Sequence, residues 1–356
     1  MTTTKNRPLK LKSNSTLLPK QNRAKAFAPA TSANLATGFD LLGISFDLIG
    51  DVVTVEVIDE PTVKVASVTG LLTELPVDPQ KNTATAGLLH LIRDYQLPFG
   101  FSLSIEKGIP LGSGMGGSAA SAVAALVAAN SLLSSSLPND RLLHYALISE
   151  AIAGVVEPNQ FWAQEHMISS SHPDNVVPCL LGGLTLSTIV PEQIDSDGSK
   201  NKSKLHAISL PIPKDLYLVL VHPHLKIITQ EARAILSSQV PMHLHTQQSA
   251  LLALFINGCY LNRLDLIQDS LRDLIVEPQR SRLIPGFHQA QQVAMENGAF
   301  GCSISGSGPT LFALTNQPLA AEKIKLEMQG QFAEMDIDSE GWVAALPCRG
   351  AHVLEI

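Results

Sequence analysis

Aromatic and charged residues are scarce in this sequence, at 5% and 16% of its 356 residues. Apolar residues make up 45%, which is enough to fill a core and excludes a chain that is disordered throughout. The formal net charge of -7 excludes the basic surface expected of a nucleic-acid-binding protein. A chain of this length predicts two domains or one large one.

Cysteine is scarce as well, and no cysteine lies near another. Cys179, Cys259, Cys302 and Cys348 form no CxxC pair, so the sequence predicts neither a zinc site nor a disulfide framework. Reduced, buried thiols are typical of cytoplasmic proteins, and we expect this location. The N-terminus also lacks the apolar stretch of a secretory signal.

Charge is absent from one long stretch, Gly108 to Asn139. A membrane span needs roughly 20 predominantly apolar residues. This stretch is interrupted by Pro110 and by several glycines and serines, and its apolar part, Ala119 to Ala129, is too short to cross a bilayer. The stretch therefore predicts a buried helix behind a glycine-rich loop, and no membrane association.

Acidic residues are absent from the N-terminal end, where the first carboxylate is that of Asp40. We interpret residues 1–22 as a basic, disordered tail. A second polar segment, 191–206, is rich in Gly, Ser and Lys and predicts a surface loop near a domain boundary. We therefore expect two domains, at 23–190 and 207–356.

Strand and helix patterns are mixed along the remaining chain. They predict strands at 51–58, 63–68, 101–105, 184–190, 216–221, 301–304, 310–314 and 341–348. They predict helices at 83–94, 118–133, 139–154, 229–236, 249–260, 264–274, 286–297 and 320–331. Because strands and helices do not alternate regularly, the predicted fold class is α+β.

The glycine-rich loop admits three interpretations. Gly112, Gly114 and Gly117 match GxGxxG, the pattern of a dinucleotide site. The preceding strand alternates, however, and lacks the continuous apolar run of a parallel sheet. A second interpretation is a phosphate cradle, in which backbone amides and the start of the next helix attract the anion. The third is a tight turn whose serine caps the helix.

Polar side chains suited to a small charged ligand form further clusters. They are Asn34 and Asp40; His172, Asp174 and Asn175; Thr229 and Arg233; and Arg280 with Arg282. Arginine suits bidentate capture of a carboxylate or phosphate. A second Gly/Ser turn, 303–310, has amides that could line a cleft. Taken singly, each cluster is also explained as an ordinary turn or a solvated surface.

Three motifs together resemble the GHMP small-molecule kinases. They are PATSANLATGFD at 29–40, PLGSGMGGSAAS at 110–121 and SISGSGPT at 303–310. The FD ending of the first motif, HPDNV at 172–176 and EPQRSRLIPGF at 277–287 are similar to the homoserine kinases of that superfamily. The resemblance extends from about residue 25 to the end of the chain.

This resemblance implies a two-domain GHMP kinase fold. The N-terminal domain would be of the ribosomal-protein-S5 type and the C-terminal domain ferredoxin-like, with ATP and substrate in the cleft between them. The implied reaction phosphorylates the hydroxyl of L-homoserine with ATP and Mg²⁺, on the route to threonine. A homodimer is also implied.

The resemblance assigns roles to individual residues. Nucleotide binding falls to Lys81, Asn82, Pro110, Leu111, Gly112, Ser113, Gly114, Met115, Gly116, Gly117, Ser118, Ala119 and Ala120. Homoserine binding falls to Asn34, Asp40, His172, Asp174, Thr229, Arg233 and Arg280. Catalytic roles fall to Asp174, Asn175 and Arg233, without an unambiguous general base. Asp40 or Asp174 would hold the substrate ammonium, while Arg233 and Arg280 would hold its carboxylate.

Two positions depart from the pattern of the superfamily. Ala36 replaces the first glycine of the NLGxGFD motif. The superfamily has two metal ligands, of which the first is the serine that matches Ser118 and the second is a glutamate. Gln164 occupies the position of that glutamate here. Glu150 fits the local context of that ligand on a predicted helix, and Glu165 is the alternative. We expect Ser118 and Glu150 to bind the metal.

Two other functions stay open at this point. One is a different GHMP kinase, such as a mevalonate-type kinase, against which the amino-acid clamp argues. The other is a binding protein that keeps the fold without turnover, against which the phosphate loop and the metal ligands argue.

Overall fold

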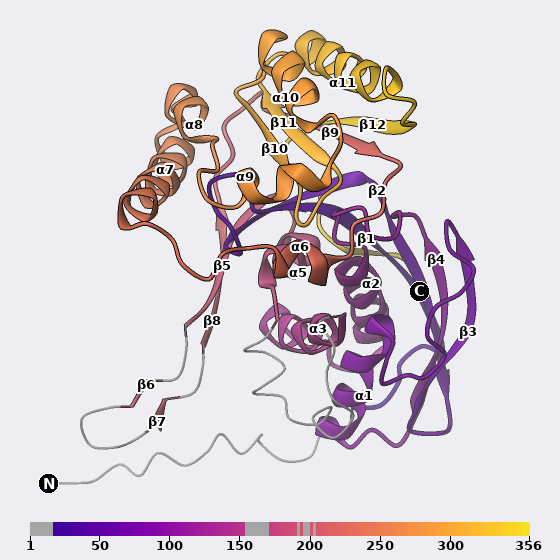
Figure 1. The fold of residues 1–356 in the computed structure, drawn as a ribbon. Coiled ribbons are helices and arrows are strands. Elements are labelled where there is room, and N and C mark those ends of the chain that lie inside the picture. Colours follow the sequence, from indigo (N-terminus) through magenta and orange to yellow (C-terminus); the bar gives the residue numbers. More distant parts are fainter. Residues whose placement is uncertain (1–16, 154–170, 191–192, 195–199, 202–203) are drawn as a thin grey trace, which may run out of the picture.

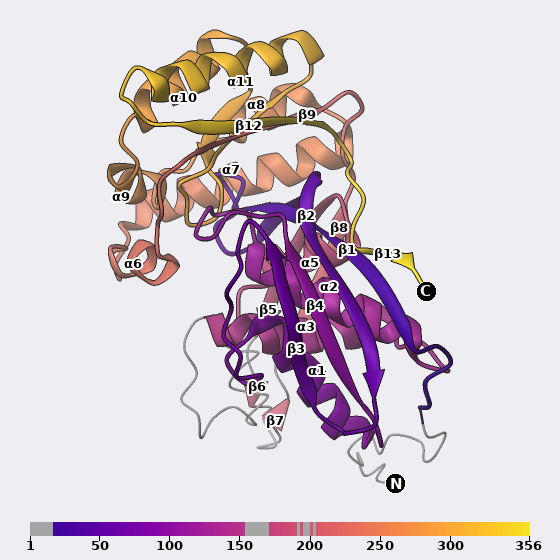
Figure 2. The same cartoon turned by 90° about the vertical axis from the view of Figure 1, so that its right-hand side faces the viewer.

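The computed structural model describes residues 17–153, 171–190, 193–194, 200–201 and 204–356. These residues form a large and a smaller β-sheet, each covered by helices (Figures 1 and 2). A two-stranded ribbon, β6 (Gln193–Ile194) with β7 (Lys200–Asn201), lies apart from both. The α+β class predicted from the sequence is confirmed.

The large sheet holds seven strands, in the order β13-β1-β2-β4-β3 with β5 pairing both β2 and β8. Its strands are β1 (Arg23–Ala33), β2 (Leu42–Ile58), β3 (Val63–Gly70), β4 (Gly100–Lys107), β5 (Leu184–Val190), β8 (Lys204–Leu210) and β13 (His352–Glu355). All pairs are antiparallel except β3 with β4. The first and last strands of the described residues, β1 and β13, therefore lie side by side.

Helices α1 (Thr83–Tyr95), α2 (Gly117–Leu132) and α5 (Pro173–Leu181) pack against this sheet, and α3 (Asn139–Ala153) packs against these three helices (Figure 1). Helix α2 is enclosed by the sheet and its neighbouring helices, and its alanines are almost all fully buried. A helix that is apolar on all sides is stable only when buried. This position explains why the sequence carries no charge from Gly108 to Asn139.

The smaller sheet has the order β10-β11-β9-β12, all antiparallel. Its strands are β9 (Tyr217–Pro223), β10 (Gly301–Ile304), β11 (Leu311–Thr315) and β12 (Ser339–Ala345). Alternate residues of β9 face two cores: Val219 and Val221 contribute to one, and Leu218 and Leu220 to the other. Because both faces are covered, the strand is a continuous apolar run.

Helices cover both faces of this sheet (Figure 2). On one side lie α10 (Phe287–Glu296) and α11 (Pro318–Ala333), and on the other α7 (Met242–Leu261) and α8 (Leu264–Ser270). The short helices α6 (Thr229–Ala234) and α9 (Glu277–Arg280), followed by a 3₁₀ turn at Ser281–Leu283, lie toward the large sheet.

Three segments differ from the expectation. Residues 28–33, for which the sequence patterns predict no strand, belong to β1, where they pair with β2 from Ala33 opposite Gly43 onward. Residues 204–206, expected in a surface loop, begin β8. HPDN starts helix α5, with Pro173 in the first turn, where its missing N–H costs no hydrogen bond.

The domain boundaries drawn from the sequence stay a prediction. Strand pairing places 207–210 and 352–355, both assigned to the C-terminal domain, in the large sheet. Within the predicted tail, Leu17 is buried and the backbone of Lys20 donates a hydrogen bond to Leu132. The rest of that tail, 1–16, lies outside the described residues.

Candidate active site

One cavity of about 560 Å³ is lined by segments from both halves of the molecule. They include the connections from β1 to β2, β3 to α1, β4 to α2 and β9 to α6, the turn between β10 and β11, and residues of α3, α5 and α9. The described residues to which the resemblance assigns a role all line it except Ala119 and Ala120, whereas Arg282, also a candidate, is exposed and does not line it. These two alanines are fully buried in the first turn of α2, so they pack in the core behind the loop.

The loop between β4 and α2 depends on its glycines. Gly112, Gly114 and Gly116 have φ of 67°, 77° and 69°, in the region that only glycine adopts without strain. A Cβ on Gly114 would lie 2.4 Å from the carbonyl oxygen of Ser305. The glycines thus allow a fold in which the loop meets a second backbone, and α2 begins directly after it at the cavity.

That second backbone is the Gly/Ser turn between β10 and β11. The Ser305 hydroxyl donates to the Gly114 carbonyl at 2.9 Å, and the Thr310 N–H donates to the Ser113 carbonyl at 3.2 Å. Gly306 also donates to Ala33, at 3.2 Å. The turn therefore holds the glycine-rich loop in place, and its Gly306 and Ser307 line the cavity.

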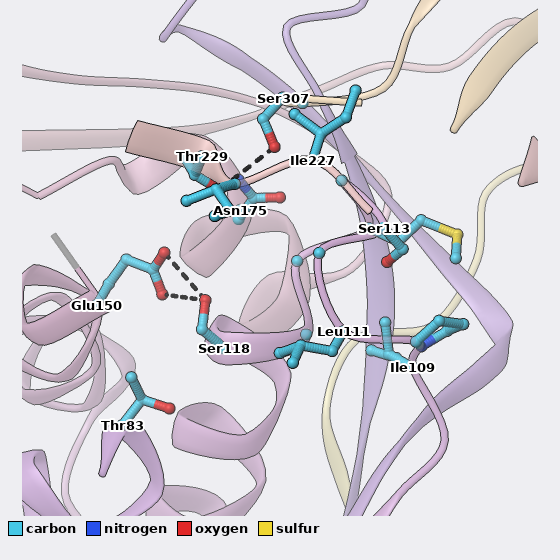
Figure 3. A pocket seen from close by; sticks show the side chains of 18 of the residues that line it. Thr83, Ile109, Leu111, Ser113, Ser118, Glu150, Asn175, Ile227, Thr229 and Ser307 are labelled. Atoms are coloured by element: carbon cyan, nitrogen blue, oxygen red, sulfur yellow. Dashed lines mark hydrogen bonds between the residues drawn. The ribbon is translucent and has the colours of Figure 1, made fainter. Parts of the chain in front are cut away.

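Ser118, in the first turn of α2, faces Glu150 of α3 (Figure 3). The Ser118 hydroxyl donates to the Glu150 carboxylate, at 2.9 Å and 3.2 Å to its two oxygens. Burial raises the pKa of Glu150 to about 7, and the bond from Ser118 offsets this only in part. The rival residue, Glu165, lies outside the described residues.

This pair suits Mg²⁺. A hydroxyl and a carboxylate are the hard oxygen donors that Mg²⁺ prefers, and it commonly takes one or two carboxylates and completes its shell with phosphate and water. A carboxylate buried without a cation, with a raised pKa, is stabilised when a cation binds. Among the described residues, no group of three or more His, Cys, Asp or Glu forms a cage that would need no phosphate.

Asp40 and Arg233 form an ion pair at the other end of the cavity. The Nη2 atom of Arg233 donates to both oxygens of Asp40, at 2.8 Å and 2.9 Å. His172 Nδ1 lies 3.7 Å from Asp40, but burial lowers the pKa of His172, so its ring is neutral at neutral pH. Opposite charges are thus placed side by side, as an amino-acid zwitterion requires.

A second arginine, Arg280, is held beside this pair. It is 4% exposed, and its guanidinium donates to the carbonyls of Ala232, at 2.9 Å, and Gly306, at 3.0 Å. The ring of Phe39 lies 5.2 Å from the Arg280 guanidinium and 5.5 Å from that of Arg233. These contacts keep two guanidinium groups at the cavity despite their like charge.

Asp174 is the most buried acid of the cavity, at 3% exposure. Its Oδ1 atom has no hydrogen-bond partner among the described residues. Burial, reinforced by the negative charges of Asp40 and Glu150, raises the pKa of Asp174 to about 8. A buried acceptor without a partner, facing a cavity, is suited to a cationic or hydroxyl group of a ligand.

The amides predicted to bind substrate already have protein partners. Asn34 donates to the Gly306 carbonyl at 2.9 Å and accepts from the Asp40 N–H at 3.0 Å. Asn175 accepts from the Thr31 hydroxyl at 2.7 Å. Both residues line the cavity, so their side chains hold neighbouring segments of its wall together and can also contact a ligand.

Thr229 and Ala36 occupy two further predicted positions. Thr229 begins α6, and its hydroxyl lies 3.3 Å from that of Ser307 (Figure 3). Ala36 is buried, with a φ of 58°, in the left-handed region where the superfamily pattern has glycine. A small residue does fit there, at the cost of strained backbone.

Lys81 and Asn82 line the opposite end of the cavity. Lys81 lies 3.8 Å from the carboxylate of Asp78. The side chain of Asn82 caps α1 by accepting from the Ala84 N–H at 2.9 Å, and donates to the Pro76 carbonyl at 2.9 Å. Asn82 therefore also shapes the segment that precedes α1.

Sequence reasoning missed a buried ionic network below the loop. The ammonium of Lys107 pairs with Asp51 and donates to the Gly117 carbonyl at 2.9 Å and the Ser121 hydroxyl at 2.8 Å. Asp51 is fully buried and also accepts from the Gly108 N–H at 3.1 Å. One signal was available: Lys107 is the last charge before the uncharged stretch.

Comparisons with known proteins agree with this geometry. The model of the GHMP kinases N terminal domain matches residues 82–183, and that of the GHMP kinases C terminal matches 251–334. A homoserine kinase of Xylella fastidiosa is 43% identical over 94% of this chain and 95% of its own. The crystal structure of homoserine kinase from Cytophaga hutchinsonii is 36% identical, with a TM-score of 0.82 over 96% of this chain and 100% of that one.

The chain is therefore a GHMP kinase with the two-domain fold of that superfamily. Within it, the chain belongs to the homoserine kinase family. The L. major mevalonate kinase, solved with R-mevalonate, shares the fold at 15% identity and a TM-score of 0.61, over 94% of this chain and 100% of that one. No helix among the described residues is long and apolar enough to cross a membrane.

Proposed function

We propose that this enzyme transfers the γ-phosphoryl group of ATP to the side-chain hydroxyl of L-homoserine, giving O-phospho-L-homoserine and ADP. The observation that carries the proposal is a single cavity with two unlike ends. One end has a glycine-rich loop and a helix N-terminus, which suit phosphates. The other has two arginines and two carboxylates, which suit the charges of an amino acid.

At the amino-acid end, each charge of the substrate has a counter-charge. We assign the carboxylate to Arg233 and Arg280, and the ammonium to Asp40 or Asp174. Because Asp40 and Arg233 pair with each other in the free enzyme, the substrate exchanges that pair for two new ones. Asn34, His172 and Thr229 complete the wall of this end.

At the phosphate end, the loop at 110–118 surrounds the triphosphate with the backbone amides of residues 111–118, and Ala119 and Ala120 support it. Lys81 and Asn82 are assigned to the nucleotide base. Mg²⁺ held by Ser118 and Glu150 would neutralise charge on the phosphates when bound. Phosphoryl transfer relies on position and charge more than on covalent chemistry, so Asp174, Asn175 and Arg233 act by orienting the acceptor hydroxyl.

The acceptor assignment is tested by measuring ADP release with L-homoserine, mevalonate, galactose or no acceptor. We expect turnover with homoserine and formation of phosphohomoserine by mass spectrometry. Equal turnover with mevalonate would favour the mevalonate-type alternative, and no turnover with any acceptor would favour a binding protein. Arg233→Ala should raise KM for homoserine on the order of 100-fold, with a smaller rise for Arg233→Lys, because a charged hydrogen bond contributes about 1.5–3 kcal/mol.

The metal assignment is tested with Glu150→Gln and Glu165→Gln, assayed side by side. Loss of the ligand should lower kcat about 100-fold or more, because metal stabilisation of phosphoryl charge is worth several kcal/mol. Ser118→Ala should weaken use of Mg-ATP while the fold stays intact. A severe loss in Glu165→Gln alone would move the site away from Glu150.

We further infer a place in threonine biosynthesis and a cytoplasmic location, which the four free, buried cysteines support. A homodimer stays a prediction from the resemblance. The acidic net charge supports the absence of nucleic acid among the partners.

A further inference from the structure

Five cationic side chains line the cavity, and four of them are already engaged: Lys81 with Asp78, Lys107 with Asp51, Arg233 with Asp40, and Arg280 with two backbone carbonyls. The fifth is Lys226. Its ammonium has no carboxylate within 4.0 Å among the described residues, and the side chain is exposed to the cavity. Lys226 is therefore the cation that a ligand can pair with at no cost to another ion pair.

Lys226 lies beside the glycine-rich loop, in the connection from β9 to α6. The N–H of its neighbour, Ile227, donates to the Gly112 carbonyl at 3.5 Å. A Cβ placed on Gly112 would lie 3.2 Å from Cγ of Lys226. Ile227 is buried in the core below the small sheet, so the backbone at this point is fixed while the lysine side chain is not.

The charges that line the cavity leave a bound triphosphate in need of an unpaired cation. The loop itself carries no charged side chain, and Asp40, Glu150 and Asp174 are acidic. Lys107 is neutralised below the loop by Asp51. A triphosphate bound along the loop would otherwise meet backbone dipoles and a metal ion, but no unpaired protein cation.

We propose that Lys226 binds the phosphate chain of ATP from the C-terminal side of the cavity, opposite the amides of the loop. This inference rests on the proposed kinase function. Lys226 crosses from the C-terminal half to a loop of the N-terminal half, so its contact with the phosphates joins the two halves over the nucleotide. The amino-acid end has its own arginines, Arg233 and Arg280, and does not require it.

The test compares Lys226→Met, which keeps the apolar stem, with Lys226→Arg, which keeps the charge. Lys323→Met is the matched control, since it removes the same charge from exposed α11, outside the cavity. Calorimetry measures binding of ADP and of adenosine to each protein. We expect Lys226→Met to bind ADP about tenfold more weakly, near the lower limit for a hydrogen bond to a charged group. Adenosine should bind equally to all.

Two further readouts separate a phosphate contact from a structural role. The loss of ADP affinity should shrink as salt rises, because an exposed charge is screened. In steady-state assays KM for ATP should rise about tenfold and KM for homoserine should not change. Lys226→Arg should restore most of the affinity.

Three results would overturn the proposal: unchanged ADP affinity in Lys226→Met, an equal loss of adenosine binding, or a rise in KM for homoserine alone. Failure of the kinase function would be seen separately, as absent phosphohomoserine formation by the unaltered enzyme. In that case ADP binding would still test Lys226 as a phosphate-binding residue.

Discussion

At the scale of single residues, the unusual groups are the two buried carboxyls of the cavity. Burial raises the pKa of Asp174 to about 8 and that of Glu150 to about 7. Without ligands, neither carboxyl forms an ion pair with a cation among the described residues. Burial therefore makes the ionised form of each carboxyl unfavourable. Such groups are typical of sites in which the ligand supplies the missing charge.

The raised pKa of Asp174 predicts a stability difference that depends on pH. The folded state binds more protons than the unfolded state between pH 3.8 and about 8, so stability falls as pH rises through this window. Asp174→Asn removes the effect. Without ligands, its Tm should exceed that of the unaltered protein by on the order of 4 °C at pH 8.5 and by little at pH 4, as measured by calorimetry.

Asp269→Asn, an exposed change on α8, serves as the control and should leave the two Tm curves parallel. If Asp174→Asn also gave a curve parallel to that of the unaltered protein, Asp174 would not carry a raised pKa.

At the scale of elements, the phosphate end depends on how strand β4 meets helix α2. Lys107 ends the strand, and its ammonium donates to the Gly117 carbonyl and the Ser121 hydroxyl in the first two turns of the helix. Asp51, from the neighbouring strand β2, closes the network. Removing one partner of such a buried ion pair is costly, because the charge that remains is buried away from water and has no counter-charge.

Lys107→Met should therefore destabilise the enzyme by about 3–5 kcal/mol, as judged by urea unfolding. It should also weaken ADP binding, since the first turn of α2 loses its anchor. The double variant Lys107→Met/Asp51→Asn should recover much of the stability, because no lone charge is left buried. An unaltered urea midpoint in Lys107→Met would contradict the role of the network.

At the scale of the whole molecule, the last described strand pairs with the first. Strand β13 pairs with β1, with Ala26 opposite Val353, and covers an edge of the large sheet. The pairing of β13 with β1 also joins the C-terminal half of the chain to the large sheet. Unpaired strand edges are prone to pair with other molecules.

Deletion of residues 351–356 should lower Tm by several degrees and increase self-association, because it leaves the edge of β1 unpaired. Thermal unfolding and light scattering measure the two effects. Replacing Leu354 by serine, which keeps the backbone pairing, should have a much smaller effect on association. Equal behaviour of the deleted and full chains would show that the edge needs no cover.

Prediction succeeded where local pattern and tertiary role coincide. The apolar spacing of α1, the uncharged apolar run of α2 and the alternation of β4 identified these elements within a few residues. It failed for β1, whose residues 28–33 are small and polar and acquire strand geometry only by pairing with β2. Strand β13 is four residues long, too short for a pattern to be seen.

The residues of the candidate site also fall into those that the sequence reveals and those that only the fold reveals. The glycines at 112, 114 and 116 are recognisable in the sequence, because their positive φ strains any other residue. Phe39 and Lys226 carry no local signal, and the position of Lys107 before the uncharged stretch does not reveal its partner. Their significance lies in what faces them: two arginines, a buried aspartate and the phosphate loop.

The sequence by itself determined the α+β class, the absence of charge around α2, the glycine-rich loop and, through its motifs, the kinase superfamily. Only the tertiary structure decided which charges are paired and which are left for a ligand. Asp40 pairs with Arg233 and Lys107 with Asp51, whereas Asp174 and Lys226 form no ion pair among the described residues. The reason is physical. Propensity and periodicity act between neighbours along the chain, whereas pairing and burial of charge depend on residues that folding brings together from distant segments.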